Sequence, residues 1–228
     1  MDYYFISYGL TLLALVITVS AQGFVSGSYN KYSNIRNNKQ ISGREVARKI
    51  LDKNGLNNVD VVEVSGVLSD HYDPKNKVVR LSSNIYSGSS IASVSVASHE
   101  CGHAIQDKDG YLFMRVRSRL VPVVNFSSYA GYIAITLGVF ASSFNLIWIG
   151  IILEMMILLF QLVTLPVEID ASRRALREIE KERILSKDEF SQGKIMLTSA
   201  ALTYVASVIN VLLQVLRLIF LYGRRDND

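Results

Sequence analysis

The sequence Val96-Ala97-Ser98-His99-Glu100-Cys101-Gly102-His103-Ala104-Ile105-Gln106 decides how this chain is interpreted. On an α-helix, His99 and His103 lie four positions apart and therefore on one face, where both imidazoles can bind one Zn²⁺ while Glu100 reaches a water on the metal. The chain has 3 histidines, and two of them at this spacing around a glutamate form the core of a zinc peptidase site. The alternative interpretation is an accidental surface pair.

The composition predicts an integral membrane protein. Hydrophobic residues make up 50% of the chain, and they are gathered into apolar blocks near the 20 residues or so that an approximately 30 Å hydrocarbon core requires. We expect four transmembrane helices, at about 4–25, 120–141, 144–165 and 199–222. A short uncharged turn at 142–145 makes the middle two a helical hairpin. The first block lacks a positively charged segment before it, so we interpret it as a retained anchor and not as a signal peptide.

The lysines and arginines beside these spans predict the orientation. Basic residues crowd both ends of the segment 26–118 and the loop after the third span, whereas the N-terminus and the turn at 142–145 carry none. Both large loops should therefore face the cytoplasm. Arg224 and Arg225 run against this orientation, although two aspartates follow them. The net charge of +4 then reflects membrane topology, and no aromatic-basic pattern supports a nucleic-acid partner.

The predicted segments are an anchor at 1–25, a catalytic segment at 26–118, a transmembrane hairpin at 119–165, a cytoplasmic helical segment at 166–198, and a last transmembrane helix with its tail at 199–228. In the catalytic segment, Ser42 and Glu45 form a capping box that predicts a helix at 43–53, ending at Asn54-Gly55. Two strands, 61–65 and 77–82, joined through a turn at 73–76, predict a small β-hairpin. A helix at 89–107 would then carry the metal motif. The strand 77–82 is either a free edge that binds an extended peptide or an edge covered by a loop.

A catalytic zinc takes three protein ligands and a water, so one ligand besides His99 and His103 is needed. The open alternatives are His71, Glu168, Asp170 and more remote carboxylates. Glu168 follows the third span, and Pro166 suits the first turn of a new cytoplasmic helix. The membrane hairpin would return the chain to the face it left and bring Glu168 back beside the metal.

Several other positions have two interpretations. Cys101 is either a further metal ligand or a small buried residue that packs behind the active-site helix, and we favour the second. Glu154 lies inside the third predicted span, and Asn210, Gln214 and Arg217 share one face of the fourth. These polar residues either make structural contacts, with a Glu154–Arg217 pair geometrically possible, or form a polar cavity open to substrate segments. We favour structural contacts.

Three motifs in order resemble the YugP-type neutral zinc metallopeptidases of bacterial membranes. They are the segment 96–106 quoted above, Leu68-Ser69-Asp70-His71-Tyr72-Asp73-Pro74, and Leu165-Pro166-Val167-Glu168-Ile169-Asp170-Ala171-Ser172. The layout is also similar to that of the HtpX-type gluzincin membrane peptidases. The resemblance implies a mainly α multi-pass protein of the bacterial cell membrane with a zincin-like α+β catalytic unit. It further implies zinc as cofactor, with His99, His103 and Glu168 as ligands and Glu100 as general base.

One position departs from the HtpX-type pattern, because Ser172 stands where those proteins place an aspartate four residues after the ligand glutamate. We therefore expect the support for a zinc-bound histidine to come from elsewhere, with Asp170 available but off the Glu168 face. His71 and Tyr72 are the expected donors to the oxyanion. The alternative is that 70–74 is a polar loop held by its own hydrogen bonds.

The expected function is a zinc endopeptidase that hydrolyses membrane or membrane-associated proteins at the cytoplasmic face. A site-2-type intramembrane protease is disfavoured because the helix at 89–107 is too polar to span and a distant Leu-Asp-Gly is absent. A metal-binding scaffold without turnover is the alternative from another class, and Glu100 argues against it because a structural site needs no base. The sequence assigns no oligomeric state or accessory partner.

Overall fold

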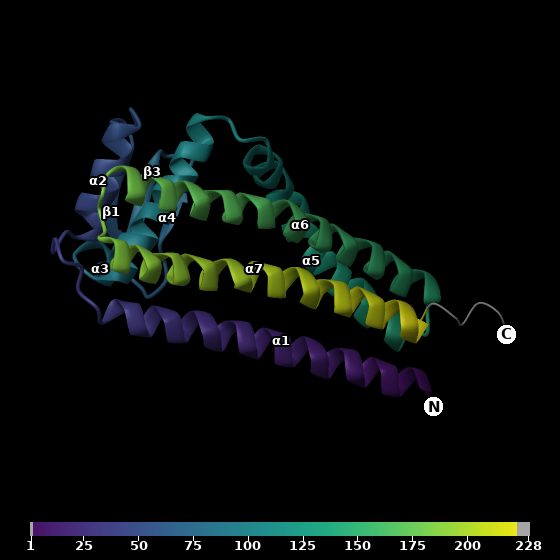
Figure 1. Ribbon diagram of the computed structural model, residues 1–228. Helices are drawn as coiled ribbons and strands as arrows, with labels where there is room; N and C mark the ends of the chain where they lie inside the picture. The colour runs from purple at the N-terminus through teal and green to yellow at the C-terminus, as the bar shows by residue number, and fades with distance from the viewer. Residues whose placement is uncertain (1, 223–228) are drawn as a thin grey trace. The chain divides into compact units, whose positions relative to one another are not determined.

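The structure, a computed structural model, describes residues 2–222. Met1 and residues 223–228, which include the predicted tail with Arg224 and Arg225, lie outside the described residues. The elements in chain order are α1 (Asp2–Ser33), α2 (Gly43–Lys53), β1 (Asp60–Val64), β2 (His71–Asp73), β3 (Val78–Ser82), α3 (Ser83–Tyr86), α4 (Ile91–Lys108), α5 (Leu112–Phe140), α6 (Phe144–Lys181) and α7 (Lys187–Tyr222) (Figure 1).

The chain forms two compact units, and each is described by itself. The first consists of residues 1–22, 115–165 and 203–228, and the second of residues 23–114 and 166–202. The first unit contains most of the apolar helical surface. The second contains the sheet, α2, α3, α4 and the polar halves of α6 and α7.

Four helices are long and apolar enough to cross a membrane: α1, α5, α6 and α7. This confirms the four predicted spans, although the helices extend well beyond them. α5 and α6 form the predicted hairpin, which turns at Ser142 with a positive φ of 49°. The two helices approach closely at Gly150, where an added Cβ would lie 2.3 Å from Ile135 Cγ1 and 3.0 Å from the carbonyl oxygen of Gly131. Small residues permit this close helix packing, which is common in membrane proteins.

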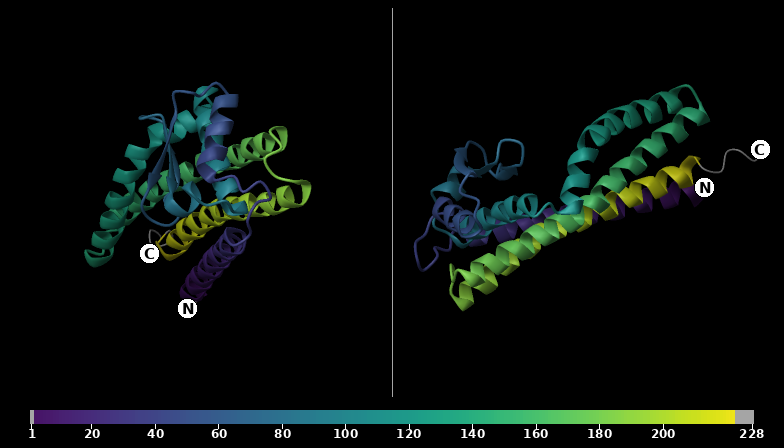
Figure 2. Two further views of the ribbon diagram at one scale, coloured as in Figure 1. Left: turned by 90° about the vertical axis from the view of Figure 1, so that its left-hand side faces the viewer. Right: turned by 90° about the horizontal axis from the view of Figure 1, so that it is seen from above.

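The second unit begins with the predicted capped helix. In α2, Ser42 Oγ accepts from the Glu45 amide while the Glu45 carboxylate accepts from the Ser42 amide, and the chain leaves the helix through Asn54 and Gly55. Val46, Ala47, Ile50 and Leu51 of α2 are fully buried in the core of this unit. α2 packs along α4, and α4 also contacts β2 and β3 (Figure 2). The metal-motif helix is therefore held from several sides.

The sheet differs from the predicted two-stranded hairpin. It has three strands in the order β1-β3-β2, with β1 parallel and β2 antiparallel to β3. The turn at 73–76 joins β2 to β3, because Asp73 Oδ1 accepts hydrogen bonds from the amides of Lys75 and Asn76. β3 is thus the central strand, and the prediction that 77–82 is an edge was wrong. The edges are β1 and β2.

Pro166 does not lie in the first turn of a new helix, as the sequence predicted. It is inside the continuous helix α6 and does not begin a new helix. Its missing N–H removes one hydrogen bond from the helix, but the helix continues for 15 further residues to Lys181. The ligand candidate Glu168 therefore lies on the same helix as the third predicted span.

Candidate metal centre

α4 positions the two histidines. The helix starts at Ser90, whose hydroxyl accepts a hydrogen bond from the Ser93 amide, and most of its residues are buried. The rings of His99 and His103 lie 4.8 Å apart between centroids and nearly perpendicular, at 85°. The i, i+4 spacing therefore places both imidazoles at one spot on the helix, as predicted.

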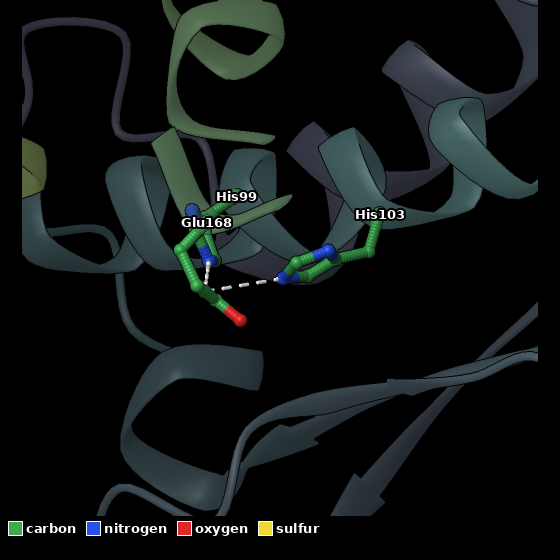
Figure 3. Close-up of side chains that lie close together, drawn as sticks. All are labelled: His99, His103 and Glu168. Atoms are coloured by element: carbon green, nitrogen blue, oxygen red, sulfur yellow. Dashed lines mark hydrogen bonds and ion pairs between the residues drawn. The ribbon is translucent and has the colours of Figure 1, made fainter. Parts of the chain in front are cut away.

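Glu168 of α6 lies between the two imidazoles (Figure 3). Its Oε2 is 3.3 Å from His99 Nε2 and 3.5 Å from His103 Nε2, and the three ligand atoms all lie within 4.8 Å of one another. Two ligands bound tetrahedrally to zinc at about 2.0–2.2 Å are themselves about 3.3–3.6 Å apart. Two imidazole nitrogens and one carboxylate are also the donor types that a catalytic zinc prefers, so these residues fit the ion.

Gly102 permits this approach of α6 to α4. A Cβ added at Gly102 would lie 2.4 Å from the carbonyl oxygen of Ala171 and 3.2 Å from its Cα. Real Cβ atoms essentially never approach that closely, so any larger residue must push the two helices apart. The glycine inside the motif therefore sets the helix spacing that brings Glu168 to the histidines.

Ser172 supports His99 directly. Its Oγ lies 3.2 Å from His99 Nδ1, on the ring side opposite the nitrogen that faces Glu168. The expectation that this support comes from elsewhere was wrong, because the Ser172 hydroxyl, one turn after Glu168 on α6, itself reaches the imidazole. Second partners of this kind orient a metal-binding histidine.

Gln106 fixes the orientation and the protonated nitrogen of the His103 imidazole. Its Nε2 donates to the carbonyl oxygen of Val167 at 2.8 Å and to Asp170 Oδ2 at 2.9 Å, and its Oε1 lies 3.0 Å from His103 Nδ1. Because both partners of the amide nitrogen are acceptors, the amide orientation is determined and Oε1 must accept from His103. Nδ1 then carries the proton, and the lone pair of Nε2 is directed toward the metal position.

Asp170 belongs to this outer layer and is not brought into the ligand cluster. Arg174 Nε donates to Asp170 Oδ2 at 2.6 Å, and Arg174 also pairs with Asp109 just beyond the end of α4. The chain of contacts from His103 through Gln106, Asp170 and Arg174 to Asp109 ties α4 to α6. Sequence reasoning missed Gln106 and Arg174, although Gln106 follows His103 by three positions and therefore shares its helix face.

The electrostatics of the cluster favour an ionised carboxylate. Burial alone would raise the pKa of Glu168, but hydrogen bonds from His103 and His99 outweigh it and hold the pKa well below its usual range. Burial alone would lower the pKa of His103, whereas the hydrogen bond and charge of Glu168 raise it above that of a free imidazole. The carboxylate and the imidazoles thus already attract each other before any ion binds.

Glu100 and Cys101 lie beside the cluster in the sequence but have different environments. Glu100 is 7% exposed, whereas Cys101 is completely buried, with its Sγ 3.6 Å from the carbonyl oxygen of Ala47 on α2. Burial, together with the charge of Glu100, raises the pKa of the Cys101 thiol. Cys101 therefore packs against α2, which confirms that interpretation over the ligand one.

The structure does not bring His71 or Tyr72 into the ligand cluster. His71 is exposed on the edge strand β2, and its Nδ1 lies 2.8 Å from the carbonyl oxygen of Ser69. The next residue on the strand, Tyr72, points to the opposite face and is buried, with its hydroxyl donating to Asp107 at 2.7 Å. Burial and the carboxylate of Asp107 raise the pKa of Tyr72.

The intramembrane polar residues do not form the pair that the sequence allowed. Arg217 Nε donates a hydrogen bond to Ser7 Oγ at 3.0 Å. Within residues 2–222, no ion pair joins Arg217 to Glu154, which is 8% exposed. The contact that the sequence allowed between these two side chains is therefore not formed, whereas the bond from Arg217 to Ser7 joins α7 to α1, as the favoured structural interpretation expects.

Comparisons with known proteins identify the family of this chain. The model of the family described as "putative neutral zinc metallopeptidase" matches residues 7–223. The chain is 44% identical over 220 residues to the "putative membrane protease YugP" of Bacillus subtilis (strain 168), which covers 96% of this chain and 98% of that protein. No solved structure matches the chain.

Proposed function

The chain belongs to the neutral zinc metallopeptidase family, and we propose that it is a zinc-dependent endopeptidase of the membrane whose metal is held by His99, His103 and Glu168. The observation that carries this proposal is the convergence of the three ligand atoms within 4.8 Å, across a helix contact that Gly102 allows. These three residues would hold the ion and would leave it able to bind a water, as in catalytic zinc sites.

Glu100 is the proposed general base. Zinc, when bound, polarises the scissile carbonyl and makes water acidic near neutral pH. Glu100, adjacent to His99 on α4, takes the proton of the attacking water and delivers it to the leaving amine. Gln106 and Ser172 hold the two imidazoles in fixed orientations while this happens. A scaffold that binds metal without turnover would need the ligands but would have no use for Glu100.

His71 is the proposed donor to the oxyanion, in preference to Tyr72. The Tyr72 hydroxyl already donates to Asp107, whereas the exposed imidazole of His71 is free at Nε2 in the described hydrogen-bond pattern. Because the Ser69 carbonyl can only accept, Nδ1 carries the proton of the neutral ring, and Nε2 donates only in the imidazolium form. His71→Ala should retain zinc and lower kcat by about 10² to 10³. A normal rate would show that His71 does not donate to the oxyanion.

The proposed substrates are membrane or membrane-associated proteins, bound as extended peptides. β2 is an edge of the sheet and contacts α4, so it now replaces β3 as the strand that would pair with substrate. The basic residues flanking the catalytic segment support a cytoplasmic location. A cysteine at Lys75, in a Cys101→Ser background, should react with a membrane-impermeant thiol reagent only after lysis. Reaction in intact cells would invert the orientation.

The proposal is tested by measuring zinc content and cleavage of an unfolded protein substrate by the purified chain in detergent. We expect stoichiometric zinc in both the unaltered protein and Glu100→Gln, and cleavage by the unaltered protein alone. Glu100→Gln is a matched control because it removes the base and leaves all three ligands. Zinc without cleavage of any membrane or unfolded substrate would favour the scaffold.

A further inference from the structure

A cavity lies between α1 and α7 in the first unit. Its volume is about 310 Å³, and it is partly open. In both Figure 1 and Figure 2 the two helices run alongside each other within this unit. The lining residues that matter are Thr11 and Thr18 of α1 and Asn210, Gln214 and Arg217 of α7.

The α7 side of the cavity is a row of three polar groups, of which only Arg217 has a protein partner in the described residues. Asn210, Gln214 and Arg217 lie at i, i+4 and i+7, so they occupy one helix face over about 10 Å of its length. In the described part of the chain, neither side-chain amide hydrogen-bonds to another residue. No carboxylate there pairs with Arg217, which donates from Nε alone, to Ser7.

α1 does not supply the missing partners. The hydroxyls of Thr11 and Thr18 donate to carbonyl oxygens of their own helix, at Ser7 and Ala14. Asn210 lies 12 residues before Tyr222, the last residue of α7, or about 18 Å along the helix. For a span that ends at residue 222, as the sequence predicts, this position lies inside the hydrocarbon of a roughly 30 Å core, where amides without partners and a guanidinium are costly and typically mark function.

We propose that this groove docks a transmembrane helix of another membrane protein, which inserts an acidic side chain between α1 and α7. The carboxylate would accept hydrogen bonds from the Arg217 guanidinium and from the amide of Gln214. The positive charge of the groove favours an acidic side chain over an amide. The inference does not depend on proteolysis, since a helix can be captured whether or not it is then cleaved.

A helix fits the groove better than a lipid does. A phospholipid phosphate sits at one depth and would satisfy only Arg217, whereas the polar row continues about 10 Å further into the hydrocarbon. The cavity is too small for a whole helix, which occupies on the order of 800 Å³ over that length at a diameter of about 10 Å. It accepts side chains from a helix lying along its mouth.

The test uses the full chain carrying Glu100→Gln in phosphatidylcholine vesicles, so that no probe is cleaved. The probes are leucine-alanine transmembrane peptides of about 20 residues. Each carries a diazirine beside a variable residue, placed about five positions from one end to match the depth of Arg217. Glutamate, glutamine and leucine versions are compared by the yield of cross-linked adduct and by mapping the adduct to α1 or α7.

We expect the adduct yield to fall in the order glutamate, glutamine, leucine, with the glutamate adduct on α1 or α7. The triple variant Asn210→Leu, Gln214→Leu, Arg217→Leu should reduce the glutamate yield about tenfold, the factor of one 1.4 kcal/mol contact. Thr136→Leu on α5 is the matched control, because its hydroxyl bonds its own helix at Tyr132, and it should change nothing. Zinc content of each variant verifies its fold.

Several outcomes overturn the proposal. Equal yields for the leucine and glutamate probes would show that the polar row selects nothing. A dominant adduct between two copies of the chain would assign the groove to self-association. An Arg217-dependent adduct with a photoreactive anionic phospholipid, unaffected by Asn210→Leu and Gln214→Leu, would assign it to a lipid headgroup.

Discussion

The α4–α6 contact and the α1–α7 contact both place polar side chains between helices, but these side chains are paired in the first contact and largely unpaired in the second. At α4–α6, Gly102 brings the helices together and the polar groups meet: His103 has Gln106, Gln106 has Asp170, and Asp170 has Arg174. At α1–α7 a cavity remains and the amides of Asn210 and Gln214 have no partners in the described residues. Polar groups that are closely packed and paired form a rigid site. A polar row that is open and largely unpaired is suited to reversible binding of a partner.

The largest effect is expected from removing Glu168, which lies at the centre of the α4–α6 contact. Glu168→Ala should lose zinc as completely as His103→Ala does, because two remaining imidazoles cannot form a three-ligand site. Zinc is measured by atomic absorption after dialysis against a weak chelator. Asp170→Ala is the comparison, and it should weaken zinc binding without abolishing it. Full zinc retention in Glu168→Ala would return the third-ligand role to His71 or Asp170.

The next effect tests the helix spacing. Gly102→Ala should destabilise the protein by about 1–3 kcal/mol, the usual cost of overpacking, and should weaken zinc binding because α6 is pushed from α4. Gly27→Ala is the matched control. Its added Cβ meets nothing within 4 Å, and alanine is the better helix former by about 1 kcal/mol. Thermal unfolding in detergent distinguishes the two. A neutral Gly102→Ala would mean that the helix spacing tolerates adjustment.

A smaller effect is expected from the outer layer. Gln106→Leu should lower zinc affinity about 10- to 100-fold, because His103 loses the acceptor that holds its Nδ1–H. Ser172→Ala should act in the same direction on His99. Chelator competition gives the affinity, and the visible spectrum of the cobalt-substituted protein reports whether the ligand geometry has changed. Unchanged affinity in both variants would show that helix packing alone orients the imidazoles.

Much of this arrangement was predictable because it depends on local signals. The capping box at Ser42 and Glu45, the turn at Asp73, the apolar blocks and the i, i+4 histidines each act within a few residues. The return of Glu168 to the metal followed from the topology of the membrane hairpin. For the local signals, the sequence spacing itself determines the geometry.

The remainder depended on contacts that sequence spacing does not encode. β2 has three residues, too few for an alternation pattern, so β3 was taken for an edge strand. Pro166 was interpreted as a helix start because that is where proline costs least, but it lies within α6. The roles of Ser172 and Gln106 required knowing how closely α6 approaches α4, which depends on Gly102 and Ala171 being opposite each other.

The smallest expected effect is the pH dependence of the metal-free protein. Glu168 has a lowered pKa, so its contribution to stability is present above its unfolded value and is lost as pH falls through the folded one. His103 has a raised pKa, so its contribution is complete below its unfolded value and is lost as pH rises through the folded one. The metal-free protein should thus be most stable between about pH 4.5 and 6.5. The free energy of unfolding of His103→Gln, measured with denaturant, should not decline at alkaline pH, because this variant lacks the titrating ring.

Zinc should oppose the loss of stability that the metal-free protein shows as pH rises, because zinc binds the neutral imidazole. The stabilisation that zinc adds should therefore grow as pH rises through the pKa of His103. Stability that is independent of pH in the metal-free protein would mean that the carboxylate and imidazole do not interact as their geometry indicates.

The most direct test of the central claim is anomalous X-ray diffraction at the zinc edge, on crystals of the purified, zinc-replete protein. We predict one strong peak at about 2.0–2.2 Å from Nε2 of His99, Nε2 of His103 and a carboxylate oxygen of Glu168. A peak bound instead by His71 or Asp170, or the absence of a peak between α4 and α6, would contradict the account.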